Sequence, residues 1–257
     1  LGDVYKRQSD DYITISQAPA WRFLEKFDYN EGLVKARLRS VCDMPIVEGA
    51  DRVLNWISKE KDKFAPLFGI SLKNLEMKSL SAEKISVPEN PFELTREEAK
   101  VIGTENDETD TIWLGYYNEP RLIYTAPAFK KGPWKASNRR TVHIAIDVFA
   151  NKGTKLFAPM EGEVFTAEYR DSPLDYGGVV ILKHTTPDND EFFTLYGHLD
   201  PQFLDALQVG DKIDKGQEFC KLGGPDVNGG WAPHVHFQIA MTTDGMEADW
   251  PGAVSYT

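Results

Sequence analysis

Cysteine is scarce in this chain, and its scarcity excludes several classes of protein. The 257 residues include two cysteines, Cys42 and Cys220, which form neither a disulfide framework nor a Cys-x-x-Cys redox motif. Cys220 lies in an apolar, strand-like run, so we expect a small buried hydrophobic side chain there.

Positive charge and long apolar runs are also lacking. The chain carries 29 lysines and arginines against 40 acidic residues, a net charge of −11, which argues against a nucleic-acid or anionic-membrane surface. No apolar stretch approaches the roughly 20 residues of a membrane span, and no signal peptide is recognisable. The sequence leaves the cellular compartment open.

The remaining composition is that of a globular protein, with 41% apolar and 12% aromatic residues. Residues 1–8 resemble a translated sequencing-adapter tail and are set aside. The sequence then predicts four regions, which are a helical segment that ends an upstream domain (9–68), an acidic linker (69–112), a β domain (113–245) and a truncated tail (246–257).

The helical segment is predicted from its apolar spacing. Val53, Trp56, Ile57 and Phe64 keep to one helix face. Residues 15–68 resemble the C-terminal helices of an aminoglycoside-phosphotransferase-type kinase, although no phosphate-binding or catalytic motif of such a kinase is present. The alternative is a plain helical appendage.

After the linker the hydrophobic period changes to two, which predicts an all-β domain of antiparallel sheets. Residues 112–117 and 121–124 are strand candidates joined by a turn at 118–120, and helix is expected only near 201–207. The further expected strands are 142–148, 156–158, 163–167, 179–183, 192–196, 218–222 and 234–240.

Four of the five histidines form an ordered pattern with one aspartate. The pattern is His143-x3-Asp147, then His198 in Leu-Tyr-Gly-His-Leu, then His234-Val-His236. A catalytic zinc site takes three such ligands and leaves a fourth position open. Two histidines and Asp147 can fill that shell, which leaves two histidines for proton transfer. His184 ends an apolar strand and is interpreted as structural.

The spacing of these residues predicts a local distortion. Four residues of extended strand span roughly 13 Å, too far for His143 and Asp147 to reach one ion. We therefore expect a bulge or loop near Ala145, with both side chains turned into one cavity beside His198, His234 and His236. The ligating atoms should then lie within about 4 Å of one another, since each sits roughly 2 Å from zinc.

The motifs from Thr141 to Ile239 resemble the catalytic domain of lysostaphin-type (LytM-like) zinc metallopeptidases, which cleave peptides of bacterial cell walls. The resemblance rests on the His-Ile-Ala-Ile-Asp-Val-Phe, Leu-Tyr-Gly-His-Leu and Pro-His-Val-His-Phe motifs and on glycine-bounded strands. It implies a half-barrel of duplicated hybrid motif type and one zinc ion per chain. By position it implies metal ligands His143, Asp147 and His236, and catalytic histidines His198 and His234.

Two positions depart from the family pattern. Ala145 stands where the family usually has glycine, and Gln238 stands where it commonly has glutamate. Zinc acidifies a bound water and polarises a carbonyl. Because the chain has no His-Glu-x-x-His glutamate, an unligated imidazole must act as the general base. The expected reaction is endopeptidase cleavage of glycine-containing, cell-wall-type peptides.

Two alternatives stay open. The first is a non-catalytic zinc-binding or regulatory module of a larger multidomain protein, which suits a chain fused to further domains. The second, a biotinyl- or lipoyl-type carrier domain, is disfavoured by one residue. Met160 is followed by Glu161, where such a domain needs lysine. The expected partner is therefore a peptide or peptidoglycan substrate.

Overall fold

The structure is a computed structural model that describes residues 47–72, 75–81, 94–102, 111–125, 129, 142–243 and 246–254. The predicted adapter tail, most of the helical segment with its kinase-like resemblance, and Cys42 lie outside the described residues. Within the described part no helix is long and apolar enough to cross a membrane.

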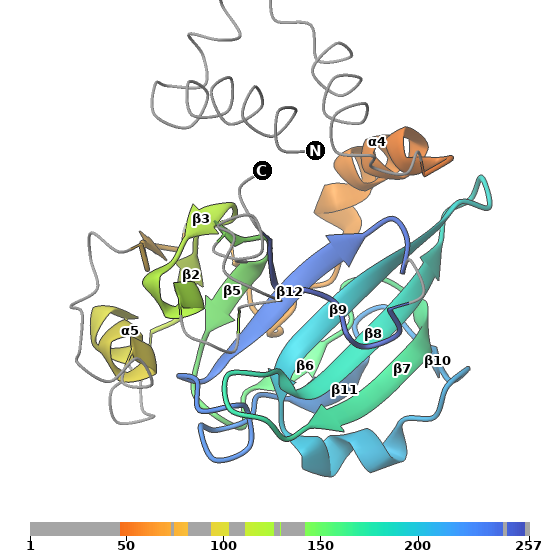
Figure 1. The fold of residues 1–257 in the computed structure, drawn as a ribbon. Coiled ribbons are helices and arrows are strands. Elements are labelled where there is room, and N and C mark those ends of the chain that lie inside the picture. The colour runs from red at the N-terminus through yellow and green to blue at the C-terminus, as the bar shows by residue number, and fades with distance from the viewer. Residues whose placement is uncertain are drawn as a thin grey trace, which may run out of the picture. The chain divides into compact units, whose positions relative to one another are not determined.

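Strands dominate the described chain, as the period-two pattern predicts (Figure 1). The helices are α4 (Ala50–Glu60) and α5 (Leu94–Ile102), with 3-10 turns η1 (Lys61–Lys63), η3 (Leu122–Thr125) and η6 (Pro201–Ala206). The strands are β1 (Met77–Lys78), β2 (Trp113–Gly115), β3 (Glu119–Pro120), β4 (Val142–His143), β5 (Ile146–Phe149), β6 (Lys155–Phe157), β7 (Gly162–Arg170), β8 (Gly177–Thr185), β9 (Glu191–Leu199), β10 (Lys212–Ile213), β11 (Glu218–Lys221), β12 (His234–Ala240) and β13 (Ala253–Val254).

The largest sheet has eight strands in the order β1-β2-β5-β12-β9-β8-β7-β10. β1 pairs with β2 in parallel, and the other neighbours in this sheet pair antiparallel. The sheet is open, and the predicted all-β fold is confirmed, with the one parallel pair as an addition.

Two apolar layers cover the two faces of β8. Val180 and Leu182 point into the main core with residues of β6 and β11, whereas Val179 and Ile181 pack against Trp250 and its neighbours. All four β8 side chains are fully buried. Each such side chain contributes about 1.5–3 kcal/mol of burial free energy, so the central strands form a rigid base for the loops at their ends.

A small sheet stands beside the large one and is built around β4. β4 pairs with β3 and with β13, so that His143 lies between Glu119 and Ala253. The third sheet contains β6 and β11 and places Cys220 in the core, buried and without a disulfide, as expected. Burial raises the pKa of the Cys220 thiol to about 12.

Helix α4 belongs to the same compact unit as the β domain, Gly49–Ser255. Val53 on its apolar face packs with Met160 and Phe192, and Arg52 pairs with Asp190 at 2.6 Å. The helix predicted around Val53 and Trp56 is therefore present, and it packs on the β domain.

Four sequence-based boundaries need correction. The predicted linker 69–112 contains β1, the fully buried Leu80 and helix α5, so part of it is folded. The predicted tail contains β13 and the buried Trp250. The turn expected at 118–120 lies at 117–118, where Asn118 has a φ of 56°, and residues 119–120 form β3. The strand expected at 121–124 is instead the 3-10 turn η3.

Candidate metal centre

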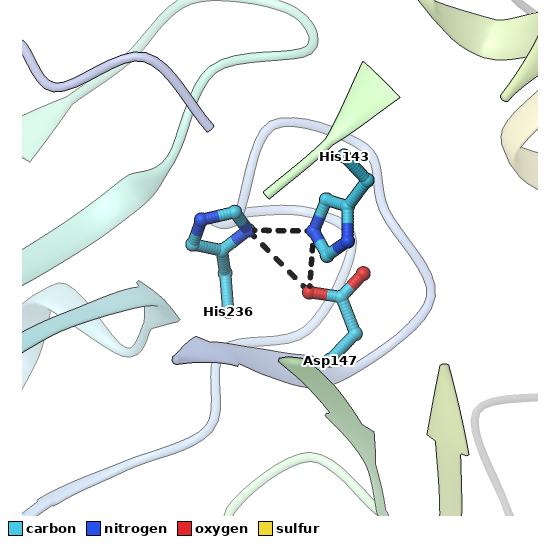
Figure 2. Close-up of side chains that lie close together, drawn as sticks. All are labelled: His143, Asp147 and His236. Atoms are coloured by element: carbon cyan, nitrogen blue, oxygen red, sulfur yellow. Dashed lines mark hydrogen bonds and ion pairs between the residues drawn. The ribbon is translucent and has the colours of Figure 1, made fainter. Parts of the chain in front are cut away.

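Three side chains converge at the junction between the large and the small sheet (Figure 2). Nε2 of His143 lies 3.1 Å from Nδ1 of His236 and 3.2 Å from Oδ1 of Asp147. Nδ1 of His236 lies 3.4 Å from the same Asp147 oxygen. All three side chains are buried. The three distances meet the geometric expectation drawn from the sequence.

A change of sheet between His143 and Asp147 explains how two residues four apart can meet. His143 ends β4 in the small sheet, the chain leaves strand geometry at residues 144–145, and Asp147 lies on β5 in the large sheet. Ala145 is buried and is not among the described non-glycine residues with positive φ. The expected distortion is present, and alanine fits it without left-handed strain.

In each imidazole, the ring nitrogen that points away from the cluster (the outer nitrogen) has a hydrogen-bond partner, which indicates which nitrogen carries the proton. Nδ1 of His143 faces the carbonyl oxygen of Tyr116 at 3.4 Å, and Nε2 of His236 faces Oε1 of Gln238 at 3.1 Å. Both oxygens accept hydrogen bonds, so each neutral ring keeps its proton on the outer nitrogen. The inner nitrogens therefore present lone pairs to each other and to Asp147.

The Asp147 oxygen at the centre of this cluster has no hydrogen-bond donor. Burial would raise the pKa of Asp147, but His143, Arg121 and His234 outweigh it and hold that pKa well below its usual range. Burial, with the Arg121 charge, lowers the pKa of His143 to about 3. Two ring nitrogens and one carboxylate oxygen thus lie 3.1–3.4 Å from one another. This donor set, two imidazoles and one carboxylate, fits a zinc ion.

His198 reaches the cluster through a β-bulge. Across β8 and β9, Gly178 is opposite Leu199 and Val180 is opposite Tyr196, so Gly197 and His198 share the space of one residue. His198 has a φ of 64°, uncommon for a residue other than glycine. Its amide donates to the Tyr176 carbonyl at 2.8 Å, which stabilises this turned backbone.

His198 and His234 present the same nitrogen to the site. Nδ1 of His198 bonds to the Asn228 carbonyl at 3.0 Å, and Nδ1 of His234 bonds to the Ala232 carbonyl at 2.6 Å. Their Nε2 atoms therefore carry free electron pairs, and that of His234 lies 3.8 Å from Oδ1 of Asp147. Burial is the main cause that lowers the pKa of both rings, so both are neutral at neutral pH.

A buried arginine, which the sequence interpretation missed, holds the other Asp147 oxygen. Nη1 of Arg121 donates to Oδ2 of Asp147 at 2.5 Å, and Nε donates to Oε2 of Glu119 at 3.0 Å. The sequence signal was weak, because Arg121 is a lone cation before an apolar run and its partner lies 26 residues further on.

A cleft of about 250 Å³ opens onto His198 and His236. Its lining includes the aromatic residues Tyr124, Phe129, Tyr176, Trp231 and Trp250 and the two acidic residues Asp175 and Asp249. The hydroxyl of Tyr176 donates to the Trp250 carbonyl at 2.9 Å, which ties two of these walls together. The cleft is the way by which a ligand can reach the histidines.

The fifth histidine lies apart from this site. His184 is buried, with Nδ1 2.6 Å from the Glu161 carbonyl and Nε2 2.7 Å from the Thr194 hydroxyl. Both ring nitrogens have partners within the fold, as expected of a structural histidine.

The fold and the cluster were next compared with known protein families. Residues 141–248, less than half of the chain, match the sequence profile of Peptidase family M23. The predicted resemblance is confirmed for this region.

Three solved structures to which parts of the chain are similar illustrate the comparison. They are a zinc-containing peptidase from Vibrio cholerae (22% identity, 44% of this chain and 30% of that chain, TM-score 0.33), Csd3 from Helicobacter pylori (24%, 48% and 29%, TM-score 0.30) and the catalytic domain of lysostaphin from Staphylococcus simulans (24%, 47% and 82%, TM-score 0.33). The chain thus spans about 30% of the length of the first two. The comparison with curated proteins gave no match.

Proposed function

We propose that the chain is a zinc metalloendopeptidase that cleaves peptide bonds in glycine-containing peptides of the bacterial cell-wall type. One zinc ion per chain would be held by His143, Asp147 and His236. The observation that carries the proposal is the buried Asp147 oxygen that has no hydrogen-bond partner and lies 3.2 and 3.4 Å from one ring nitrogen each of His143 and His236. A bound zinc ion would supply Lewis acidity, which acidifies water and polarises a carbonyl group.

Proton transfer falls to the two histidines outside the ligand set. Each holds its ring proton on Nδ1 through a backbone carbonyl, so Nε2 can accept a proton from water and return it to the leaving amine. The ring centroids of His198 and His234 lie 4.3 Å apart, so both imidazoles serve the same reacting group. The lowered pKa of each ring keeps it neutral and ready to accept.

The cleft supports a substrate with small side chains. Its volume of about 250 Å³ is below the roughly 300–1,000 Å³ common for ligand pockets, and aromatic rings occupy part of its lining. A glycine-containing peptide brings its backbone close to His198 without a side chain to accommodate. The cell-wall source of that peptide rests on the family resemblance.

His234→Ala tests the proposal. The variant should bind zinc as the wild type does, yet cleave an oligoglycine peptide about 10²–10⁴-fold more slowly, because it loses a general base. His184→Gln, a histidine variant outside the cluster, should keep both properties. If zinc-loaded wild-type protein cleaves neither oligoglycine peptides nor peptidoglycan fragments, the chain is a non-catalytic zinc-binding or regulatory module.

A further inference from the structure

Two of the three proposed ligands are held by residues outside the matched domain. Tyr116 and Arg121 both precede residue 141, where the family match begins. The Tyr116 carbonyl accepts from His143, and Arg121 bonds to Asp147. The segment that includes β2 and β3 therefore contacts the candidate metal centre directly.

The two oxygens of Asp147 have different surroundings. Oδ2 accepts from Arg121, while Oδ1 faces His143 and His236 without a donor. Because the two oxygens are chemically equivalent, a half-turn about the side-chain torsion would restore the same contacts, whereas any intermediate angle would weaken both. The bond from Arg121 selects the orientation in which Oδ1 points at the imidazoles.

Arg121 is itself held in place by an ion pair with Glu119, on the side away from Asp147. Its Nε donates to Glu119, whose other oxygen accepts from the Ser79 hydroxyl at 2.8 Å and from the Leu80 amide at 2.9 Å. The side chains of Arg121 and Glu119 are 3% and 6% exposed, so water does not compete for these bonds. The order of contacts runs from the backbone at Leu80 through Glu119 and Arg121 to Asp147.

Gly115 on β2 leaves the room that the guanidinium occupies. A Cβ at this position would lie 2.9 Å from Nη2 of Arg121 and 3.4 Å from Cβ of Asp147. β2 pairs with β5, which carries Asp147, so the glycine faces the ion pair from the neighbouring strand. Any larger residue there would displace the arginine or the aspartate.

We propose that Arg121, buttressed by Glu119, is a positioning residue that orients Asp147 for metal binding. This inference rests on the proposed zinc site but goes beyond the matched domain, because the residue comes from the preceding segment. Partners of ligating carboxylates and imidazoles commonly change metal affinity about 10–100-fold when they are replaced.

The test measures zinc affinity of the full chain by competition with a chromophoric chelator, together with the visible spectrum of the Co²⁺-loaded protein. Arg121→Gln should bind zinc about 10–100-fold more weakly and change the Co²⁺ spectrum. Arg121→Lys should lose less zinc affinity than Arg121→Gln, because lysine keeps the positive charge. It should still bind zinc more weakly than the wild type, because lysine cannot bond to Glu119 and Asp147 at once as the guanidinium does. The control is Arg52→Gln, which removes another arginine–aspartate pair, with Asp190, and should leave both readouts unchanged.

Gly115→Ala keeps the test decisive if Arg121→Gln does not fold. This variant retains every charged group and should still weaken zinc binding and alter the Co²⁺ spectrum. Wild-type zinc affinity in folded Arg121→Gln, or in Gly115→Ala when the former is unfolded, would overturn the inference. A wild-type chain that binds no zinc would instead refute the proposed function on which it rests.

Discussion

Gln238, which stands where the family commonly has glutamate, keeps the hydrogen bond to His236 but carries no charge. Its Oε1 accepts from Nε2 of His236, which leaves the electron pair of Nδ1 for the cluster. A glutamate there would accept the same bond and add a negative charge. The amide therefore preserves the tautomer of His236, and the family's common carboxylate is not needed for that purpose.

Glu98 on α5 gives a residue-scale prediction about pH. Burial raises the pKa of Glu98 to about 8, opposed by Arg121 and assisted by Asp147 and Glu119. The folded state therefore keeps this proton at pH values where the unfolded chain has lost it. The resulting stability is present below the ordinary pKa of 4.5 and is lost as the pH rises to about 8.

Glu98→Gln should remove that pH dependence, because the amide mimics the protonated acid. In chelator-treated protein, the melting temperature of the variant relative to the wild type should rise between pH 5 and pH 8. The control is Glu97→Gln on the same helix, whose carboxylate pairs with Lys100 at 2.6 Å. Parallel pH profiles for wild type and Glu98→Gln would contradict the assignment.

At the scale of elements, the end of β9 decides where His198 points. The bulge at Gly197 and His198 turns the histidine out of strand alternation and toward His234. Gly197 is required at this point because a Cβ would lie 2.5 Å from Cδ1 of Tyr176. The Tyr176 ring lines the cleft, so the bulge and the cleft wall are packed as one unit.

Gly197→Ala should therefore destabilise the fold by about 1–3 kcal/mol through overpacking. Denaturant unfolding of Gly197→Ala, Tyr176→Ala and the double variant measures the coupling between the two positions. The double variant should lose less stability than the sum of the single losses, since removal of the ring relieves the clash. Strictly additive losses would mean that the ring and the new methyl do not meet.

The sequence predicts regular strands better than it predicts these junctions. Alternation and glycine boundaries located β7, β8, β9 and β12 within a few residues, because long strands bury one face or both in a repeating way. β3 has two residues and no period to detect, and it lies where Asn118-Glu-Pro reads as a turn. The Arg121–Asp147 pair was missed since it joins a residue just after β3 to a residue on β5, a tertiary contact without a local signal.

The convergence of His143, Asp147 and His236 could be predicted from the sequence, because these residue types are known metal ligands. The chain has few histidines, so the combinations of two imidazoles and a carboxylate that could bind one metal ion can be compared directly. A straight strand would separate His143 and Asp147 by roughly 13 Å, so a shared ion required a distortion near Ala145. The physical solution, a change of sheet between β4 and β5, could not be foreseen from residues 142–149 alone. It depends on β3 and β13, which pair with β4 from distant parts of the chain.

On the scale of the whole molecule, the candidate site is formed by residues inside the family match and supported by segments before and after it. β5, β9 and β12 supply Asp147 and three histidines from the large sheet, and β4 supplies His143 from the small one. Arg121 and Glu119 support this meeting point from the preceding segment, and β13 pairs with β4 from the following one. Residues 141–248, the region of the family match, thus lack contacts that the ligand cluster uses.

Metal analysis of the purified chain tests the central claim most directly. We expect about one zinc ion per wild-type chain, and its loss in Asp147→Ala, because Oδ1 of Asp147 is the shared vertex of the cluster. His184→Gln should retain the zinc. Full zinc content in an Asp147→Ala, His236→Ala double variant would contradict the account, because the ion would then be bound elsewhere.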